Sequence, residues 1–121
     1  MRIRPVALPV TAALMALGLT SGAPAMAAPK LQGTIGPGFT ISLKDAHVKA
    51  VKTLKHGKYR LTVQDKSSIH NFTLNGPGTK NKMITGTGFV GTKTVTLTLK
   101  KGTYRFYCTV HPTITGTFKV T

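Results

Sequence analysis

The sequence predicts an all-β fold, a Greek-key β-sandwich of about seven to eight short strands. Apolar and polar residues alternate with a period of two along most of the chain after residue 30, and helical periodicity does not recur there. Turn sequences rich in Gly separate the alternating segments, and Thr, whose branched side chain favours strands, is abundant within them.

A strand over residues 39–43 follows a Gly-Pro-Gly turn sequence, and alternation places Phe39, Ile41 and Leu43 on its inner face. The next residues, 44–54, also suit a strand, although a small helix is compatible with their pattern. The sequence leaves that choice open.

The clearest alternation occurs over residues 59–65 and 94–100. Each segment carries apolar residues at every second position and is bounded by turn sequences that contain Gly. The predicted inward residues are Tyr59, Leu61 and Val63 in the first strand, and Val95, Leu97 and Leu99 in the second.

The only Cys in the chain lies in the segment GTYRFYCTVHP, residues 102–112. Alternation places Tyr104, Phe106, Cys108 and Val110 on the strand face that turns toward the core. A thiol in this position is an inert small apolar group, a nucleophile or a metal ligand. A nucleophile needs a base and an orienting group, and the sequence offers nothing beyond two nearby histidines.

These histidines have a spacing that suits a metal site. His70, in SSIHNFTLNGPG, shares the inward parity of Phe72 and Leu74, so its ring turns toward the core at the start of a strand. His111 lies just past Cys108, in the loop where that strand ends. A thiolate and two imidazoles favour copper, and a trigonal Cys-His-His site is the blue-copper geometry. The other two histidines, in polar Lys-rich segments, are interpreted as solvated surface residues: His47 and His56.

Three segments in this order, SIHNFTLNGPG, GTYRFYCTVHP and GTFKV, together resemble the small plastocyanin-like cupredoxins, the type 1 blue copper proteins. The likeness extends over about residues 33–121. The resemblance implies one copper ion, cycling between Cu(I) and Cu(II), with His70, Cys108 and His111 as its ligands.

The resemblance also implies how the ligand loops are braced and where the chain departs from the family. Asn71 would tie the two loops together near Thr109 and support the thiolate. Cupredoxins of this type usually have a weakly bound Met two residues before the Gly of the last strand, where this chain has Ile114 before Gly116. A non-coordinating Ile implies a higher reduction potential, because losing a thioether donor destabilises Cu(II) more than Cu(I).

Residues 1–27 have the layout of a secretory signal peptide, in which Arg2 and Arg4 precede an apolar run and small residues precede the cut. Interruptions in that run disfavour the alternative, a membrane anchor. The expected mature chain, residues 28–121, is a single cupredoxin-like domain without a membrane span. We expect it in the periplasm or outside the cell.

The chain is strongly basic, with 17 Lys and Arg against two acidic residues and a net charge of +15. Loss of Arg2 and Arg4 with the signal peptide lowers this charge by two, to +13. Such a surface attracts an acidic redox partner protein or an anionic envelope surface, and its self-repulsion favours a monomer. Export, scarce Arg and the absence of Trp argue against nucleic acid as a physiological partner.

We therefore expect a single-electron carrier and not an enzyme. One domain with four His cannot assemble the additional copper centre that multicopper oxidases use. Two alternatives stay open: an extracytoplasmic protein that binds or delivers copper without redox turnover, and a metal-free module of the same fold that binds anionic partners.

Overall fold

The computed structural model describes residues 27–121, so the predicted signal peptide, apart from its last residue, lies outside the described residues. Within them the chain forms nine strands and no helix. The strands are β1 (Lys30–Ile35), β2 (Ile41–Asp45), β3 (Thr53–Leu54), β4 (Gly57–Asp65), β5 (Phe72–Gly76), β6 (Thr79–Thr85), β7 (Gly91–Leu99), β8 (Gly102–Tyr107) and β9 (Thr115–Val120).

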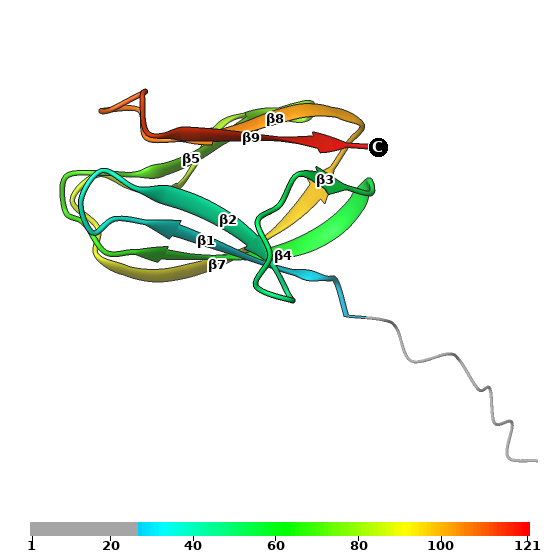
Figure 1. The fold of residues 1–121 in the computed structure, drawn as a ribbon, viewed down its shortest axis with the longest axis horizontal. Coiled ribbons are helices and arrows are strands. Elements are labelled where there is room, and N and C mark those ends of the chain that lie inside the picture. Colours follow the sequence, from blue (N-terminus) through cyan, green and yellow to red (C-terminus); the bar gives the residue numbers. More distant parts are fainter. Residues whose placement is uncertain (1–26) are drawn as a thin grey trace, which may run out of the picture.

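Two sheets pack face to face, which confirms the predicted all-β sandwich (Figure 1). One sheet has the strand order β2-β1-β4-β7, and the other has the order β3-β9-β8-β5-β6. Both sheets are mixed, because β1 pairs with β4, and β3 with β9, in parallel. The sequence pattern assigned no range to β1 or β6, which explains the larger number of strands.

The core lies between the sheets and is built from the apolar residues that alternation predicts. Leu61, Val63, Leu97 and Leu99 are buried in the first sheet. In the second sheet, aromatic rings from neighbouring strands stack, with centroids 6.0 Å apart for Phe72 and Phe106 and 5.2 Å apart for Tyr104 and Phe118. Burial of such apolar surface is the main source of stability in a domain of this size.

The segment 44–54 contains a turn followed by the short strand β3, and not the small helix that the sequence left open. The Asp45 carboxylate accepts hydrogen bonds from the backbone N–H groups of His47 and Lys49, at 2.8 and 3.1 Å. These bonds close a tight turn in place of a helical one.

Phe39 does not lie on the inner face of a strand, contrary to the prediction. Strand β2 begins two residues later, at Ile41, and 68% of the Phe39 side chain is exposed. Strand parity fails here because the residue belongs to the loop between β1 and β2.

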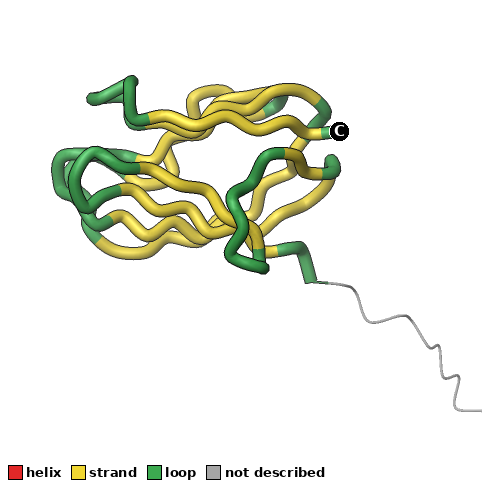
Figure 2. Tube along the Cα trace, in the orientation of Figure 1, coloured by secondary structure: helices red, strands yellow, loops and turns green. Residues whose placement is uncertain are grey.

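Four loops gather at one end of the sandwich, at the left in Figure 2. They follow β1, β4, β6 and β8, and they span residues 36–40, 66–71, 86–90 and 108–114. This end carries the three residues of the predicted site, His70, Cys108 and His111. No helix within residues 27–121 is long and apolar enough to cross a membrane.

Candidate metal centre

His70 reaches the end of the sandwich through a tight turn after β4. The Asp65 carboxylate accepts a hydrogen bond from the Ser67 backbone N–H at 3.0 Å, which turns the chain away from the first sheet. The chain then crosses to β5 in the second sheet. The His70 side chain is fully buried, as its inward parity predicts.

Cys108 and His111 come from the loop that joins β8 to β9. The Cys108 N–H donates to the Ile114 carbonyl at 3.1 Å, and the Ile114 N–H donates to the His111 carbonyl at 2.9 Å. These bonds hold the loop compact, with the Cys108 side chain fully buried and His111 half-buried. Because β5 pairs with β8, with Thr73 opposite Tyr107, the loop lies beside His70.

The structure brings His70, Cys108 and His111 into one cluster, with their potential ligand atoms all within 4.8 Å of one another. The Nδ1 atoms of the two imidazoles are 3.0 Å apart. The Cys108 Sγ atom is 3.8 Å from the His70 Nδ1 atom. Three residues that lie up to 41 positions apart in the chain therefore present nitrogen and sulfur atoms to one point.

Asn71, directly after His70, connects the two loops of the cluster. Its backbone N–H donates to the Cys108 sulfur at 3.4 Å. Its side-chain amide donates to the Thr109 hydroxyl at 2.7 Å, and its side-chain oxygen accepts from the Thr109 backbone N–H at 3.1 Å. The amide also donates to Thr87, and Thr73 donates to the side-chain oxygen. A buried side chain with all its polar atoms paired holds both loops in one arrangement.

Gly38 and Phe39 contact the histidines, and the sequence analysis did not assign them to the site. The His70 Nε2 atom is 2.9 Å from the Gly38 carbonyl, so this nitrogen is the donor and carries the proton. The Phe39 ring meets both imidazoles edge-on, with centroids 5.3 Å from His70 and 5.2 Å from His111. The Gly-Pro-Gly turn was visible in the sequence, but its proximity to His70 depends on tertiary packing.

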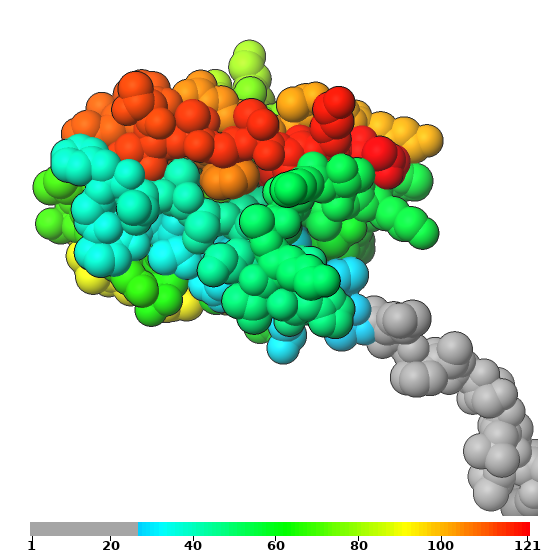
Figure 3. All heavy atoms as spheres, in the orientation of Figure 1, coloured from blue at the N-terminus to red at the C-terminus, as the bar shows by residue number. Residues whose placement is uncertain are grey.

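Ile114 is buried at the loop that carries His111, and 5% of its side chain is exposed. Together with Phe39 and Ile41 it lines a shallow hollow of about 250 Å³ at this end of the molecule. Figure 3 shows the same neighbourhood, with the cyan segment around residue 40 against the orange-red segment near residue 114.

Three other predicted positions can be placed. Val110 is 52% exposed and does not share the core face, because β8 ends at Tyr107 and the strand alternation ends with it. His47 and His56 are exposed and do not join the cluster. The His56 imidazole instead pairs with the Thr121 carbonyl.

The donor atoms suit a first-row metal ion with a preference for thiolate and imidazole. Because the Nε2–H group donates a hydrogen bond to the Gly38 carbonyl, the neutral His70 ring presents an unprotonated Nδ1 atom to the cluster. Bonds of about 2.0–2.3 Å from an ion to nitrogen and sulfur place two trigonal ligand atoms roughly 3.5–3.8 Å apart. The 3.8 Å separation of Cys108 Sγ and His70 Nδ1 matches this value, whereas the two imidazole nitrogens would need to separate slightly.

No protein-family model and no curated protein matches the sequence. Solved structures of rusticyanin share its fold. A structure of the copper protein rusticyanin has 19% sequence identity and a TM-score of 0.52, with 76% of each chain covered. Rusticyanin from Thiobacillus ferrooxidans has 21% identity and a TM-score of 0.51, with the same coverage. Identities this low show the fold alone. The chain therefore has the cupredoxin fold, with two imidazoles and one thiol together at the loop end of its sandwich.

Proposed function

We propose that the protein is an exported single-electron carrier with a type 1 copper site. The observation that carries this proposal is the convergence of His70, Cys108 and His111 at the loop end of a cupredoxin sandwich. One thiolate with two imidazoles is the donor set of blue-copper centres. A bound copper ion would supply a Cu(II)/Cu(I) couple that accepts and releases one electron.

The residues around the cluster are arranged to move little during such a cycle. Cys108 and His70 are fully buried and bonded to neighbours that are themselves held in place. The Asn71 N–H donates to the Cys108 sulfur and helps to fix its position. Ligands that keep their positions in both oxidation states lower the reorganisation energy of electron transfer, because few bonds and dipoles have to change.

His111 is the expected exit for the electron. It is half-buried, unlike the other two cluster residues, and it lies in a loop at the end of the molecule. The exposed Phe39 ring contacts its edge. A partner that docks on this end would therefore come within a short distance of the cluster through one imidazole ring.

Two features support electron transfer over catalysis. Only one cluster of three or more potential metal ligands occurs within residues 27–121. His47 and His56, the other two histidines, are exposed and lie outside it.

The predicted signal peptide, residues 1–27, supports a periplasmic or extracellular location, in which we expect the acidic redox partner.

Ile114 favours a second candidate function, copper binding or delivery without redox turnover. We assign this buried residue to the axial position, since its backbone bonds to both Cys108 and His111. An aliphatic group there would favour Cu(I) over Cu(II). A third candidate, a metal-free module that binds anionic partners, would leave the clustered thiol and imidazoles without a role.

Copper titration of the purified metal-free protein tests these candidates. The electron carrier binds one Cu(II) and turns intensely blue through thiolate-to-copper charge transfer, and the colour disappears reversibly on reduction. Tight Cu(I) binding without a stable blue Cu(II) form would instead identify a copper-handling protein. If the protein bound neither ion, the third candidate, the metal-free module, would be supported.

A Cys108→Ser variant serves as the control for the ligand assignment. It keeps the size of the side chain but removes the sulfur, so the intense visible band should be lost. The matched variant His56→Gln changes a histidine outside the cluster and should keep the full band. A blue Cys108→Ser protein would contradict the proposed site.

A further inference from the structure

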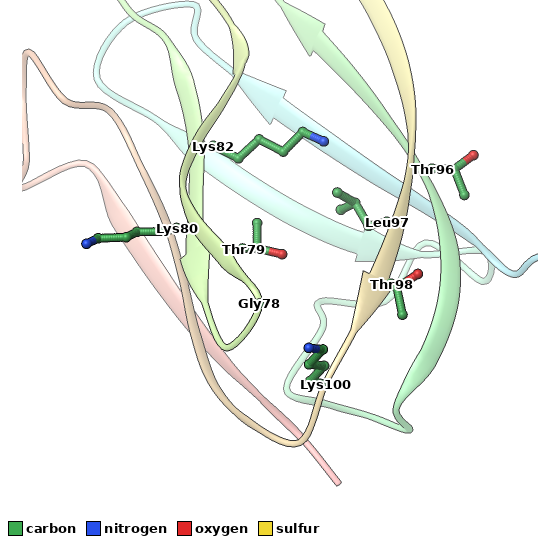
Figure 4. A pocket seen from close by; sticks show the side chains of 8 residues that line it. All are labelled: Gly78, Thr79, Lys80, Lys82, Thr96, Leu97, Thr98 and Lys100. Atoms are coloured by element: carbon green, nitrogen blue, oxygen red, sulfur yellow. The ribbon is translucent and has the colours of Figure 1, made fainter.

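We propose a second binding site, for phosphate-type oxyanions, in a hollow between the edge strands of the two sheets. The hollow has a volume of about 420 Å³ and lies between the start of β6 and the end of β7 (Figure 4). These are the last strands of their sheets, so each has one side that pairs with no other strand. The volume falls within the range of roughly 300–1,000 Å³ that is typical of small-molecule sites.

Two lysines direct their ammonium groups toward the hollow. Figure 4 shows Lys82 extending from β6 toward β7, and Lys100 rising from the end of β7, whereas the Lys80 side chain points away. Thr79, Thr96 and Thr98 also line the hollow, and Figure 4 shows the Thr79 hydroxyl directed toward β7, whereas the Thr96 and Thr98 side chains extend from the other side of β7. Ammonium and hydroxyl groups are donors that bind the oxygens of phosphate groups.

No acidic side chain neutralises this charge. The chain has only two carboxylate side chains, and neither lines the hollow. Asp45 lies at the end of β2 and accepts hydrogen bonds from its own turn. Asp65 is 1% exposed at the end of β4. The hollow therefore keeps a positive potential, which favours an anionic ligand.

The wall beside Lys100 is held in place by a buried tyrosine. The Lys100 backbone N–H donates to the Tyr104 hydroxyl at 2.9 Å, and this hydroxyl donates to the Pro77 carbonyl. Gly78, with a φ of 71°, lets the Lys100 side chain lie close to the turn, because a Cβ atom there would be 3.1 Å from the Lys100 Cδ and Cε atoms. Less side-chain freedom is then lost when a ligand binds.

The ligand class follows from the volume and the donors. A single phosphate would fill only part of the hollow, and a diphosphate or a phosphorylated sugar offers more oxygens to lysines that come from two different strands. The hollow lies at the opposite end of β6 from the cluster of His70, Cys108 and His111, since the loop after β6 lies at the cluster end. Binding is therefore expected in the metal-free and the copper-loaded protein, and its test is independent of the proposed electron transfer.

Inorganic pyrophosphate is the probe, titrated into the metal-free protein at moderate salt and followed by amide NMR shifts and calorimetry. We expect saturable binding with shifts centred on residues 78–82 and 96–100. The Lys82→Gln/Lys100→Gln variant should bind at least about tenfold more weakly, because two charge-assisted contacts are lost. The control, Lys44→Gln/Lys119→Gln, removes the same charge from exposed positions outside the hollow and should change the affinity by less than about threefold.

The source of the oxyanion is distinguished by a second arm, with vesicles that contain anionic phospholipid. Binding to these vesicles that depends on Lys82 and Lys100 would identify a lipid headgroup as the ligand, and its absence would identify a soluble phosphate compound. Equal loss of pyrophosphate binding in both double variants, or no saturable binding, would overturn the site. The lysines would then only protect two exposed strand edges.

Discussion

Asn71 shows how a single residue supports the site without being one of the three candidate metal ligands. It bonds to the Cys108 sulfur, to Thr109 twice, and to Thr87 and Thr73, and it is fully buried. The same residue starts an Asn-x-Ser/Thr glycosylation sequence, but a buried amide with every polar atom paired is not accessible for modification.

An Asn71→Ala variant should lower the free energy of unfolding of the metal-free protein by about 2–4 kcal/mol. The change leaves the Thr109 N–H and other buried groups without partners, which costs more than the bonds themselves contribute. Urea denaturation measures the effect. Asn75→Ala, which removes one bond to the exposed Asn81 N–H, should cost about 1 kcal/mol or less. Equal losses would contradict the bracing role of Asn71.

Ile114→Met tests the axial assignment in the copper-loaded protein. A thioether at that position would stabilise Cu(II) more than Cu(I), so the reduction potential should fall. Voltammetry measures the change. Thr113→Met, which places a thioether at the exposed neighbouring position, should leave the potential unchanged. A lower potential in Thr113→Met alone would refute the assignment of Ile114.

At the scale of the elements, the Phe106 ring of β8 lies over the neighbouring strand β9 because the residue opposite it, Gly116, lacks a side chain. A Cβ atom on Gly116 would overlap the Phe106 ring, and Gly76 stands in the same relation to the Tyr104 ring. The aromatic residues of β8 thus lie over glycines of the neighbouring strands, and the cluster loop begins from a rigid base.

A Gly116→Ala substitution should destabilise the protein by about 1–3 kcal/mol, because the added methyl group displaces the Phe106 ring or the strand. Gly86→Ala is the matched control, since a Cβ atom there has no neighbour within 4 Å and the backbone needs no positive φ. Thermal denaturation of both variants compares them. A Gly86→Ala loss as large as that of Gly116→Ala would contradict the packing argument.

Tyr59 in β4 should make the free energy of unfolding depend on pH in the alkaline range. Burial raises the pKa of Tyr59 above its usual value of 10.0, and its hydroxyl donates to the Lys55 carbonyl at 2.7 Å. The raised pKa means that the neutral ring stabilises the folded state fully below pH 10.0, and that this contribution disappears as the pH rises through the folded-state pKa. Tyr59→Phe should therefore show a shallower loss of unfolding free energy above pH 10.0 than the wild type. Urea denaturation at several pH values measures this loss, and an equal loss in Tyr59→Phe and the wild type would contradict the prediction.

At the scale of the whole molecule, the protein is strongly basic, and the cluster of His70, Cys108 and His111 lies at one end of the fold. The chain carries 17 Lys and Arg and two acidic residues. Large apolar side chains are exposed at the cluster end, including Phe39, Ile69, Val90 and Val110, each more than half exposed. Charge would act over long distances to attract a partner, and apolar contact would act only after docking.

Electron exchange with an acidic redox protein should therefore depend on salt. Raising the ionic strength from about 0.01 M to about 1 M shortens the screening length from roughly 30 Å to 3 Å, so the association rate should fall at least about tenfold. Stopped-flow absorbance of the copper-loaded protein measures this rate. An uncharged small-molecule oxidant is the control and should react at the same rate throughout. A salt-independent rate with the acidic protein would exclude steering by the basic surface.

Much of the fold was accessible from the sequence because strand alternation is a local pattern. Leu61, Val63, Leu97 and Leu99 lie inside as their parity predicts. Parity failed at Phe39 and Val110, which stand just beyond strand ends, where backbone geometry no longer forces alternate side chains to opposite faces. The edge strand β6 has four exposed residues in succession, so apolar and polar residues do not alternate along it and the sequence pattern did not predict it.

The sequence by itself determined the all-β class and the three residues that could share a metal ion, because residue type and strand parity are local properties. Only the tertiary structure decided what surrounds them. The Gly38 carbonyl pairs with His70 across 32 positions of sequence, and the Phe39 ring meets both imidazoles. The hollow between β6 and β7 likewise exists only because two sheets pack together. Such contacts depend on which loops the sandwich brings to the same place, and no local pattern encodes that arrangement.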